Sequence, residues 1–255
     1  MRAKDELEIL WQSEDAVAVA KPAGLATIPG RDEKDCVLDR LGLQLGLLSS
    51  GSADPRLRVV HRLDKETSGV LLFAKNLDAQ RHLSNQFQNN AISKEYVALV
   101  SGRPPEAEGE IDAPLDRHPA SPKRMAVAKH GGRPARTLWR VEQTFREFTL
   151  LRVFPKTGKT HQIRVHLLSI GLPLAIDALY HAPRPGVAPG IYLSGLKRDY
   201  RPTQGESERP LIDRLTLHAE KLTFVDRQGA TVEVVCPLPK DLRATIKQLG
   251  RWGNA

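Results

Sequence analysis

The chain has 255 residues, of which 40% are hydrophobic and 27% charged, and its formal net charge at pH 7 is +8. These fractions are ordinary for a soluble globular protein and argue against a low-complexity chain. The length suffices to bury a sizeable core in one large domain or two modest ones.

The cysteine pattern and the N-terminus exclude further classes. Cys36 and Cys236 lie far apart and have no CxxC spacing, so neither a disulfide framework nor a zinc site is expected and a reducing, cytoplasmic setting fits best. Residues 1–6 lack the apolar core of a signal peptide, and no apolar run approaches the roughly 20 residues that span a bilayer. We therefore expect no membrane partner. The basic balance indicates a polyanionic partner, nucleic acid first, although many soluble proteins are basic without one.

The first part of the chain predicts two short strands within residues 7–20, followed by a tight turn at Lys21-Pro22-Ala23-Gly24. Residues 31–48 predict a helix with one apolar side. A loop rich in Ser, Gly and Pro then leads into the most unusual stretch of the chain, residues 60–75.

That stretch places His, Arg, Asp, Lys, Glu, Thr and Ser within residues 61–68 and continues into the apolar run 70–74, which predicts a buried strand. A surface turn needs fewer charges than this. Asp64 is therefore a candidate functional carboxylate. The alternative is a solvated or helix-capping group, which is the commoner role of a single carboxylate in a turn.

The middle of the chain predicts a helix over 77–90 and a strand over 94–100 that contains Tyr96. Residues 117–136 carry basic residues without one acidic residue after Arg117, including Lys123 and Arg124. Such a run is usually a solvated face. Its single sign over about 20 residues fits a phosphate-contacting surface better.

Residues 137–154 predict two strands joined near 145–148. Gly158-Lys159-Thr160 resembles the end of a P-loop, but Val153 occupies the position of the upstream glycine, so no Walker motif exists. Thr160 is the expected N-cap of a helix that runs to Ile170. Arg164 lies on this helix, where the simplest role is that of a surface arginine.

The last part contains a long stretch, 183–210, that is rich in Pro, Gly and charge, followed by strands over 214–224 and 230–235 and a closing helix over 241–249. Strands outnumber helices and few βαβ units occur. We therefore predict an α+β fold, with a large mixed, mostly antiparallel sheet flanked by helices.

Several segments together resemble the RluA-type pseudouridine synthases, which isomerise uridine within structured RNA. The resemblance covers roughly residues 8–249. It rests on Lys21-Pro22-Ala23-Gly24 and on segments 61–69, 94–100, 157–166 and 214–219, which are similar to the family's motifs and follow in the same order. It implies a single catalytic domain over 8–249 with a central active-site cleft, and no separate N-terminal RNA-binding domain. Lys159 and Ala175-Ile176-Asp177 depart from the usual motifs, and the 183–210 stretch is longer than in many members.

The resemblance implies roles for particular residues. Asp64 is the residue that acts at the sugar, as nucleophile or by initiating elimination, and Tyr96 lies under the base or takes a sugar proton. Arg164 keeps Asp64 charged and oriented. Arg62 occupies the space left by the flipped base, and Leu217 forms part of the pocket wall. Lys123 and Arg124 contact the RNA backbone. The reaction needs no metal and no cofactor, and we expect a monomer.

Two other functions are compatible with the sequence. The chain could be a non-catalytic RNA-binding or RNA-chaperone protein on the same fold, against which the joint presence of Asp64, Tyr96 and Arg164 argues. It could also be a glycosidase, which needs a second carboxylate, and Glu66 is the nearest candidate. Family members without an extra domain act on transfer RNA, ribosomal RNA or both, and we slightly favour transfer RNA.

Overall fold

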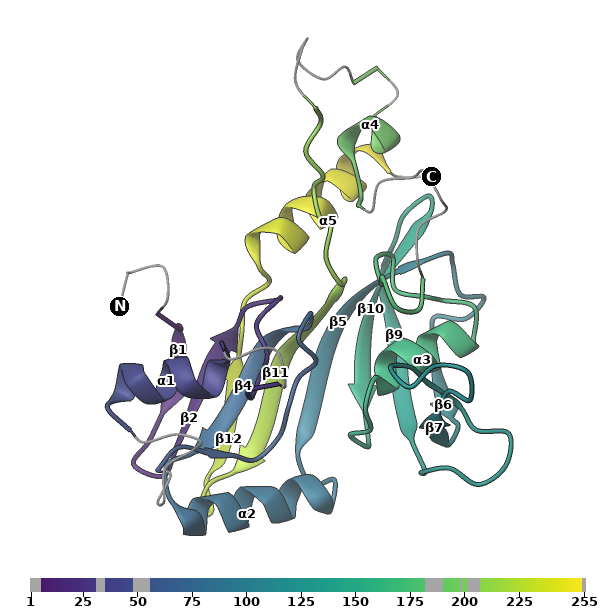
Figure 1. Ribbon diagram of the computed structural model, residues 1–255. Helices are drawn as coiled ribbons and strands as arrows, with labels where there is room; N and C mark the ends of the chain where they lie inside the picture. The colour runs from purple at the N-terminus through teal and green to yellow at the C-terminus, as the bar shows by residue number, and fades with distance from the viewer. Residues whose placement is uncertain are drawn as a thin grey trace. The chain divides into compact units, whose positions relative to one another are not determined.

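The computed structural model of the chain has an α+β fold with a large mixed, mostly antiparallel sheet and few helices (Figure 1). Two compact units make up the chain, the first from Met1–Tyr96 and His218–Pro237, the second from Val97–Leu217 and Leu238–Ala255. The predicted fold class is thereby confirmed. The structure describes residues 6–30, 35–47, 56–181, 190–197, 199–200 and 207–253.

The strands of the first unit run in the order β1-β2-β4-β11, and β3 and β12 pair with β4 and β11. Neighbours are antiparallel except β4 and β11, which are parallel. The chain passes from one unit to the other within β5 (Ser93–Ser101), within β11 (Leu217–Val225) and between Pro237 and Leu238. The remaining strands of this unit are β1 (Ile9–Gln12), β2 (Ala16–Lys21), β3 (Arg58–Val59), β4 (Ser68–Ala74) and β12 (Thr231–Val235).

Two helices pack against this sheet, α1 (Val37–Leu45) and α2 (Leu77–Gln88). Successive residues of a strand point to opposite faces, so β2 and β4 supply both packing layers. One set of alternate residues packs with α1, and the other set packs with α2. All of β4 is buried for this reason. The residues that pack with α1 are Val17, Val19, Leu71 and Phe73, and those that pack with α2 are Ala16, Ala18, Val70, Leu72 and Ala74.

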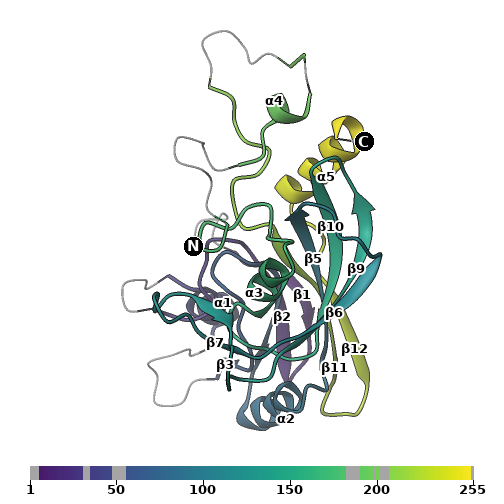
Figure 2. The same ribbon diagram turned by 90° about the vertical axis from the view of Figure 1, so that its right-hand side faces the viewer.

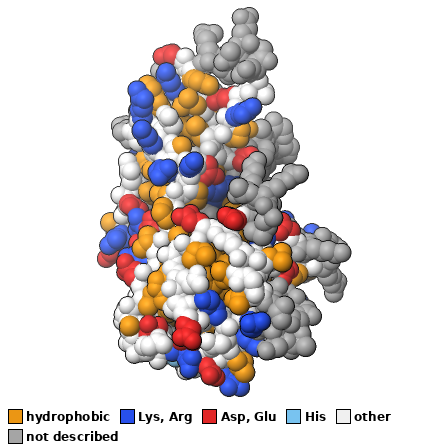
Figure 3. All heavy atoms as spheres, turned by 90° about the vertical axis from the view of Figure 1, so that its left-hand side faces the viewer, with side chains coloured by type: hydrophobic (Ala, Val, Ile, Leu, Met, Phe, Trp, Pro, Cys, Tyr) orange, Lys and Arg blue, Asp and Glu red, His pale blue; other side chains and the backbone are white. Residues whose placement is uncertain are grey.

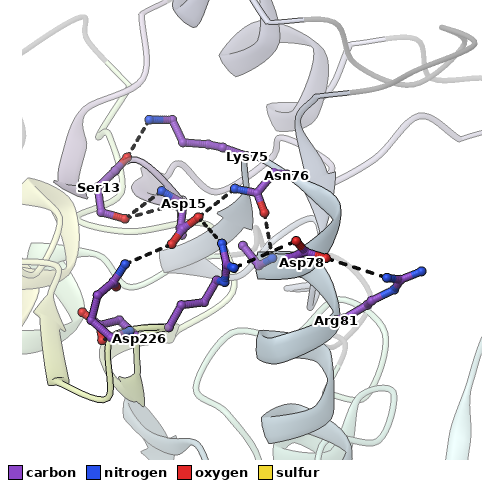
Figure 4. A network of polar contacts seen from close by, with 11 residues as sticks. Ser13, Asp15, Lys75, Asn76, Asp78, Arg81 and Asp226 are labelled. Carbon is purple, nitrogen blue, oxygen red and sulfur yellow. Dashed lines mark hydrogen bonds and ion pairs between the residues drawn. The ribbon is translucent and has the colours of Figure 1, made fainter.

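A polar network joins the turns at one edge of the first unit (Figure 4). Asp15, in the β1–β2 turn, accepts hydrogen bonds from Asn76 Nδ2 at 2.8 Å and from Arg227 at 2.9 Å. Asn76 in turn caps α2, because its Oδ1 accepts the Ala79 N–H. The hydrogen bond from Asn76, followed by those from Arg227 and Gln228, holds the pKa of Asp15 below its usual value. The start of α2 is thus fixed to two strand turns.

The second unit has a sheet in the order β5-β10-β9-β6 and a separate two-stranded sheet of β7 and β8. One core cluster lies under α5 and another beside α3. The strands are β6 (Glu108–Asp112), β7 (Leu115–Arg117), β8 (Met125–Val127), β9 (Arg136–Thr144) and β10 (Phe148–Pro155), and the helices are α3 (Gln162–Ser169), α4 (Leu193–Leu196) and α5 (Lys240–Trp252).

Most predicted elements occur close to their predicted bounds, and one cap was wrong. Thr160 does not begin α3: the N-cap is His161, in a left-handed conformation with φ 54° and no side-chain cap. The predicted helix over 31–48 is shorter, and residues 31–34 and 48 lie outside the described residues. The 183–210 stretch is described only in part, with α4 inside it. No helix among the described residues is long and apolar enough to cross a membrane.

Candidate active site

Asp64 lies at the centre of the loop 61–67, which connects β3 to β4 in the first unit. It is half-buried, between the buried Leu63 and the exposed Lys65. The Thr67 N–H donates to the Asp64 carbonyl oxygen at 3.1 Å and closes a tight turn around it. The turn feeds directly into β4, so the carboxylate stands at the end of a buried strand.

Thr27 holds the loop on the N-terminal side of Asp64. Its hydroxyl donates to the Leu63 carbonyl oxygen at 3.0 Å and accepts from the Leu63 N–H at 3.3 Å. Thr27 is only 4% exposed. A single buried hydroxyl therefore satisfies both backbone groups of the residue that precedes Asp64, as buried backbone groups require.

Lys21 holds the loop on the C-terminal side. Its ammonium donates to the Lys65 carbonyl oxygen at 2.7 Å and to the carbonyl oxygens of Pro22 and Leu25 at 2.9 and 2.6 Å. The Gly24 N–H also donates to the Lys65 oxygen, at 2.9 Å. Lys21 is 1% exposed. Lysine is almost never buried so completely unless it has partners, so the turn predicted at 21–24 is a structural support for the Asp64 loop.

The start of β4 is fixed against β11. Gly69, with φ +126°, lies opposite Ala219 in the parallel ladder, and a Cβ at Gly69 would lie far inside the van der Waals radius of the Ala219 backbone. Beside it, Ser68 Oγ lies 2.9 Å from His218 Nδ1, and His218 Nε2 lies 2.9 Å from the Cys236 carbonyl oxygen. A carbonyl oxygen only accepts, so Nε2 of His218 donates to Cys236. The buried His218 thus joins the start of β4 to the end of β12.

His61 begins the loop as a packed, neutral imidazole. Its ring stacks on Phe87 with centroids 4.5 Å apart, and Nε2 accepts the Leu72 N–H at 2.9 Å. Burial, with a smaller effect of the positive charge of Lys94, lowers the pKa of His61 to about 3. The imidazole therefore remains uncharged at neutral pH.

Tyr96 lies in β5 and packs against the same core cluster as Leu63 and Leu71. Its pKa is raised well above the usual value, first because the phenol is surrounded by protein, and second because the negative charge of Asp64 opposes the phenolate. The structure thus brings Tyr96 and Asp64 within electrostatic range of each other. The phenol is neutral at physiological pH, so it presents a ring and a hydroxyl group.

Arg164 belongs to the second unit and is buried, so it is not the surface arginine that the helix pattern alone favoured. Its Nε and one terminal nitrogen donate to the two carboxylate oxygens of Asp177, both at 2.8 Å. Asp177 also accepts the N–H groups of Leu179 and Tyr180. This bidentate pair fixes the plane of the guanidinium. The expected contact of Arg164 with Asp64 joins residues of different units and stays a prediction.

Tyr180 connects the Arg164 pair to the basic stretch. Its ring lies 4.9 Å from the Arg164 guanidinium carbon and 5.2 Å from that of Arg124. Its hydroxyl oxygen accepts the Met125 N–H at 2.7 Å and lies 2.8 Å from His161 Nδ1. The turn between β7 and β8 is thereby held against α3. Within the described chain, no acceptor lies in hydrogen-bonding range of the buried Arg124 Nε.

The remaining predicted residues occupy different positions. Lys123 is exposed on the β7–β8 turn, next to the half-buried Arg124. Arg62 is exposed on the Asp64 loop, and Leu217 is buried at the first position of β11. In the ranges that the structure describes, no three His, Cys, Asp or Glu side chains gather as a metal site.

A model of the RNA pseudouridylate synthase family matches residues 15–169. The match covers more than half of the 255 residues and contains Asp64, Tyr96 and Arg164. The chain belongs to this family. The predicted resemblance to RluA-type pseudouridine synthases is thereby confirmed.

Relatives within the pseudouridylate synthase family match almost the whole chain. Ribosomal large subunit pseudouridine synthase D of Nitrosomonas europaea is 38% identical over 246 residues, which cover 95% of this chain and 65% of the relative. The protein of the same name from Haemophilus ducreyi is 36% identical over 250 residues, with 95% and 70% covered. An uncharacterized RNA pseudouridine synthase of Chloroflexus aurantiacus is 40% identical over 232 residues, with 90% and 65% covered. The chain thus spans about two thirds of the length of these relatives.

Solved pseudouridylate synthase structures share the fold. Human RNA pseudouridylate synthase domain containing 4 superposes with a TM-score of 0.71 at 25% identity and covers 95% of this chain and 93% of that chain. Human RNA pseudouridylate synthase domain containing 1 gives a TM-score of 0.69 at 24% identity, with 94% and 86% covered.

Sequence reasoning about this pseudouridylate synthase chain missed several supporting residues. Thr27, Asp177, Tyr180 and the ammonium contacts of Lys21 were not predicted, although each is buried and holds another polar group. The available signals were the motif at 21–24 and the Asp177 that stands in a departing motif at 175–177. Neither signal says which backbone or side chain the residue contacts.

Proposed function

We propose that the chain is an RNA pseudouridine synthase that isomerises uridines within structured RNA. The observation that carries the proposal is Asp64, a half-buried carboxylate on a loop clamped from both sides and within electrostatic range of a neutral Tyr96. Membership in the pseudouridylate synthase family supplies the reaction class.

The reaction breaks the bond from the sugar to N1 of the base, turns the base and rejoins it through C5. Asp64 acts at the sugar, either by attack on the anomeric carbon or by initiating elimination. Its carboxylate must be ionised and fixed in position for either step. The hydrogen bonds of Thr27 and Lys21 to the neighbouring peptide groups fix the backbone on which this carboxylate stands.

Tyr96 is assigned to the base. Its raised pKa makes the phenolate scarce at neutral pH, so the neutral ring serves as a surface on which the base stacks, and the hydroxyl group serves as a donor. This favours contact with the base over abstraction of a sugar proton.

Arg164 is assigned to orienting Asp64, and the rigid pair with Asp177 supports this role because it presets the plane of the guanidinium. An opposite charge close to a carboxylate favours the ionised form, which is the effect proposed for Arg164. Arg62 is assigned to the place of the flipped base, and Leu217 to the wall of the pocket. The flip itself costs a few kcal/mol.

Lys123 and Arg124 are assigned to the RNA backbone. Lys123 is exposed and Arg124 is half-buried in a stretch, 117–136, that contains no acidic residue, which supports this assignment. Binding that uses such contacts weakens steeply as salt rises. No metal and no cofactor takes part in this scheme, and the chain acts as a cytoplasmic monomer.

The RNA is proposed to be large-subunit ribosomal RNA. The names of the relatives from Nitrosomonas europaea and Haemophilus ducreyi favour it over the transfer RNA that the sequence slightly favoured. A non-catalytic RNA-binding protein is the second candidate, and the clamp around Asp64 disfavours it because RNA binding alone does not need a fixed carboxylate.

The test is to map pseudouridine in ribosomal and transfer RNA from cells that lack the chain and from the same cells complemented with wild type or with Asp64→Ala. We expect sites in large-subunit ribosomal RNA that only the wild type restores. Restoration by Asp64→Ala would contradict the catalytic assignment, and lost sites confined to transfer RNA would contradict the assignment of the RNA.

A further inference from the structure

Helix α5 of the second unit carries four exposed basic residues on one side, at spacings of three, four and four residues. At 3.6 residues per turn they lie within about 80° of one another around the helix axis and extend for about 16 Å along it. Lys and Arg side chains gather along the upper left of the face drawn in Figure 3, where α5 lies. We call this set the α5 basic stripe; it consists of Lys240, Arg243, Lys247 and Arg251.

Acidic side chains do not neutralise the stripe. In the part of the chain that the structure describes, none of its four residues forms an ion pair with a carboxylate. Asp241, the acidic residue of α5, is engaged elsewhere, because both of its carboxylate oxygens accept from Arg214 at 2.6 and 2.7 Å. The stripe is therefore an uncompensated line of positive charge.

Helix stability does not explain this arrangement. Like charges three or four residues apart repel each other, and the stripe contains three such pairs in succession. Lys240 and Arg243 also lie near the helix N-terminus, where the helix dipole disfavours cations. Only Arg251, in the last turn, is favourably placed. Residues that oppose the stability of their own element are expected where a ligand makes use of them.

The opposite side of α5 argues against a membrane surface as the partner of this helix. Leu242, Thr245 and Leu249 are completely buried, and the two leucines belong to the core cluster that contains Val97 and Leu99. A basic amphipathic helix binds a membrane surface by inserting its apolar side. That side of α5 is already occupied by the core of the second unit, so only the charged side is available to a partner.

The C-terminal end of the stripe gathers further positive charge around an aromatic ring. Trp252 is 36% exposed, and its ring lies 4.9 Å from the Arg251 guanidinium and 4.8 Å from the Lys197 ammonium. Its indole N–H donates to Gln248. An exposed ring with adjacent cations is the combination that proteins use to hold nucleic-acid strands.

We propose that the α5 basic stripe binds the phosphate backbone of the substrate RNA, away from the nucleotide that reacts. The inference rests on the proposed function, in which the substrate is RNA. Figures 1 and 2 show α5 well apart from the β7–β8 turn that carries Lys123 and Arg124. The second unit thus binds the RNA at two separate places, and the contacts of α5 with phosphate groups do not depend on the RNA sequence.

The test compares two triple variants. The stripe variant is Lys240→Gln, Arg243→Gln, Lys247→Gln. The matched control is Arg81→Gln, Arg146→Gln, Arg227→Gln, which removes the same net charge from exposed arginines that do have carboxylate partners. Both are placed in an Asp64→Asn background, so that binding is measured without turnover. The affinity for one structured ribosomal RNA transcript is titrated by fluorescence anisotropy between 50 and 200 mM salt.

Each phosphate contact contributes about 0.7 to 0.9 to the slope of log affinity against log salt. Three lost contacts should lower this slope by about 2.1 to 2.7, so that the rise from 50 to 200 mM salt weakens binding of the stripe variant about 20- to 40-fold less than that of wild type. The control should keep the wild-type slope. The stripe variant should also unfold at the wild-type temperature or higher, because repulsion within α5 is relieved.

An unchanged slope in the stripe variant would overturn the inference, as would an equal loss in the control, which would reflect net charge alone. A lower unfolding temperature of the stripe variant would assign the stripe to stability and also overturn it. A failure of the proposed function is distinguishable, because it would leave wild type unable to form pseudouridine whatever the two slopes are.

Discussion

The Asp64 loop and the basic surfaces of the second unit hold their polar groups in opposite ways. Thr27 and Lys21 clamp the loop through buried hydrogen bonds on both sides of Asp64. The α5 basic stripe and the exposed Lys123 face solvent, and no carboxylate among the described residues pairs with them. Folding therefore fixes the proposed catalytic group before any ligand arrives, while the surface charges await a ligand that carries its own negative charge.

The largest expected effect tests whether a buried ion pair contributes more to the free energy of unfolding than an exposed one. Asp177→Asn removes the carboxylate that accepts twice from the buried Arg164, and we expect the free energy of unfolding to fall by about 3 kcal/mol. Asp241→Asn is the matched control. Arg214 also donates two hydrogen bonds to Asp241, but the Asp241 side chain is 38% exposed. There we expect a loss of about 1 kcal/mol. Chemical denaturation measures both, and equal losses would contradict the comparison.

An intermediate effect tests the clamp itself. Thr27→Val keeps the shape of the side chain but leaves the buried Leu63 N–H and carbonyl oxygen without the Thr27 hydroxyl, which costs about 2 kcal/mol. Because Asp64 loses its fixed backbone, we expect kcat for pseudouridine formation to fall about tenfold, equivalent to about 1.4 kcal/mol, with KM unchanged.

Two control variants accompany Thr27→Val: one keeps the hydroxyl group at position 27, and the other removes a buried hydroxyl group far from Asp64 in the sequence. Thr27→Ser should restore kcat. Thr245→Val removes another buried hydroxyl, whose partner is the Asp241 carbonyl oxygen in α5, and should leave kcat unaltered. A Thr27→Val enzyme with wild-type kcat would show that the clamp serves stability alone.

The smallest effect concerns pH. The pKa of His61 is lowered to about 3 in the folded chain, from an ordinary value of 6.5. The unfolded chain therefore binds a proton first, so the stability due to neutral His61 is present above pH 6.5 and is lost as pH falls toward 3. Between pH 6.5 and 5.5 we expect a loss of about 1 kcal/mol that His61→Gln does not show. Unfolding titrations at several pH values measure this difference, and parallel pH curves would contradict it.

The sequence predicted strands and most helices well, because their apolar periodicity is local. The two strands over 137–154 meet near 145–148, as the pattern indicated. The prediction of the N-cap of α3 was wrong, because His161 and not Thr160 is the N-cap. Instead Gln162 accepts from Thr157 and from the Lys159 N–H, and its amide donates to Arg136 and Thr137. Arg136 and Thr137 belong to β9 and lie 26 and 25 residues from Gln162, so no local pattern contains them.

The site divides in the same way. Asp64, Tyr96 and Arg164 were predicted from motifs that resemble those of the family, and their catalytic roles stay predictions. Lys21 and Thr27 were not assigned as supports, because their partners on the Asp64 loop lie 44 and 36 residues further along the chain. Lysine and arginine are expected on the surface because their side chains are charged. Lys21 and Arg164 nevertheless lie in the interior. Only the folded structure shows which charged side chains are buried and which groups they contact.

We propose that the fixed carboxylate of Asp64 starts the chemistry on an RNA held by other residues. The most direct measurement compares purified wild type with Asp64→Asn in a single-turnover assay of pseudouridine formation, together with the RNA affinity of each. We predict that the substitution, which removes the charge and keeps the shape, abolishes the product and leaves RNA affinity unchanged. Product formation by Asp64→Asn at the wild-type rate would contradict the account.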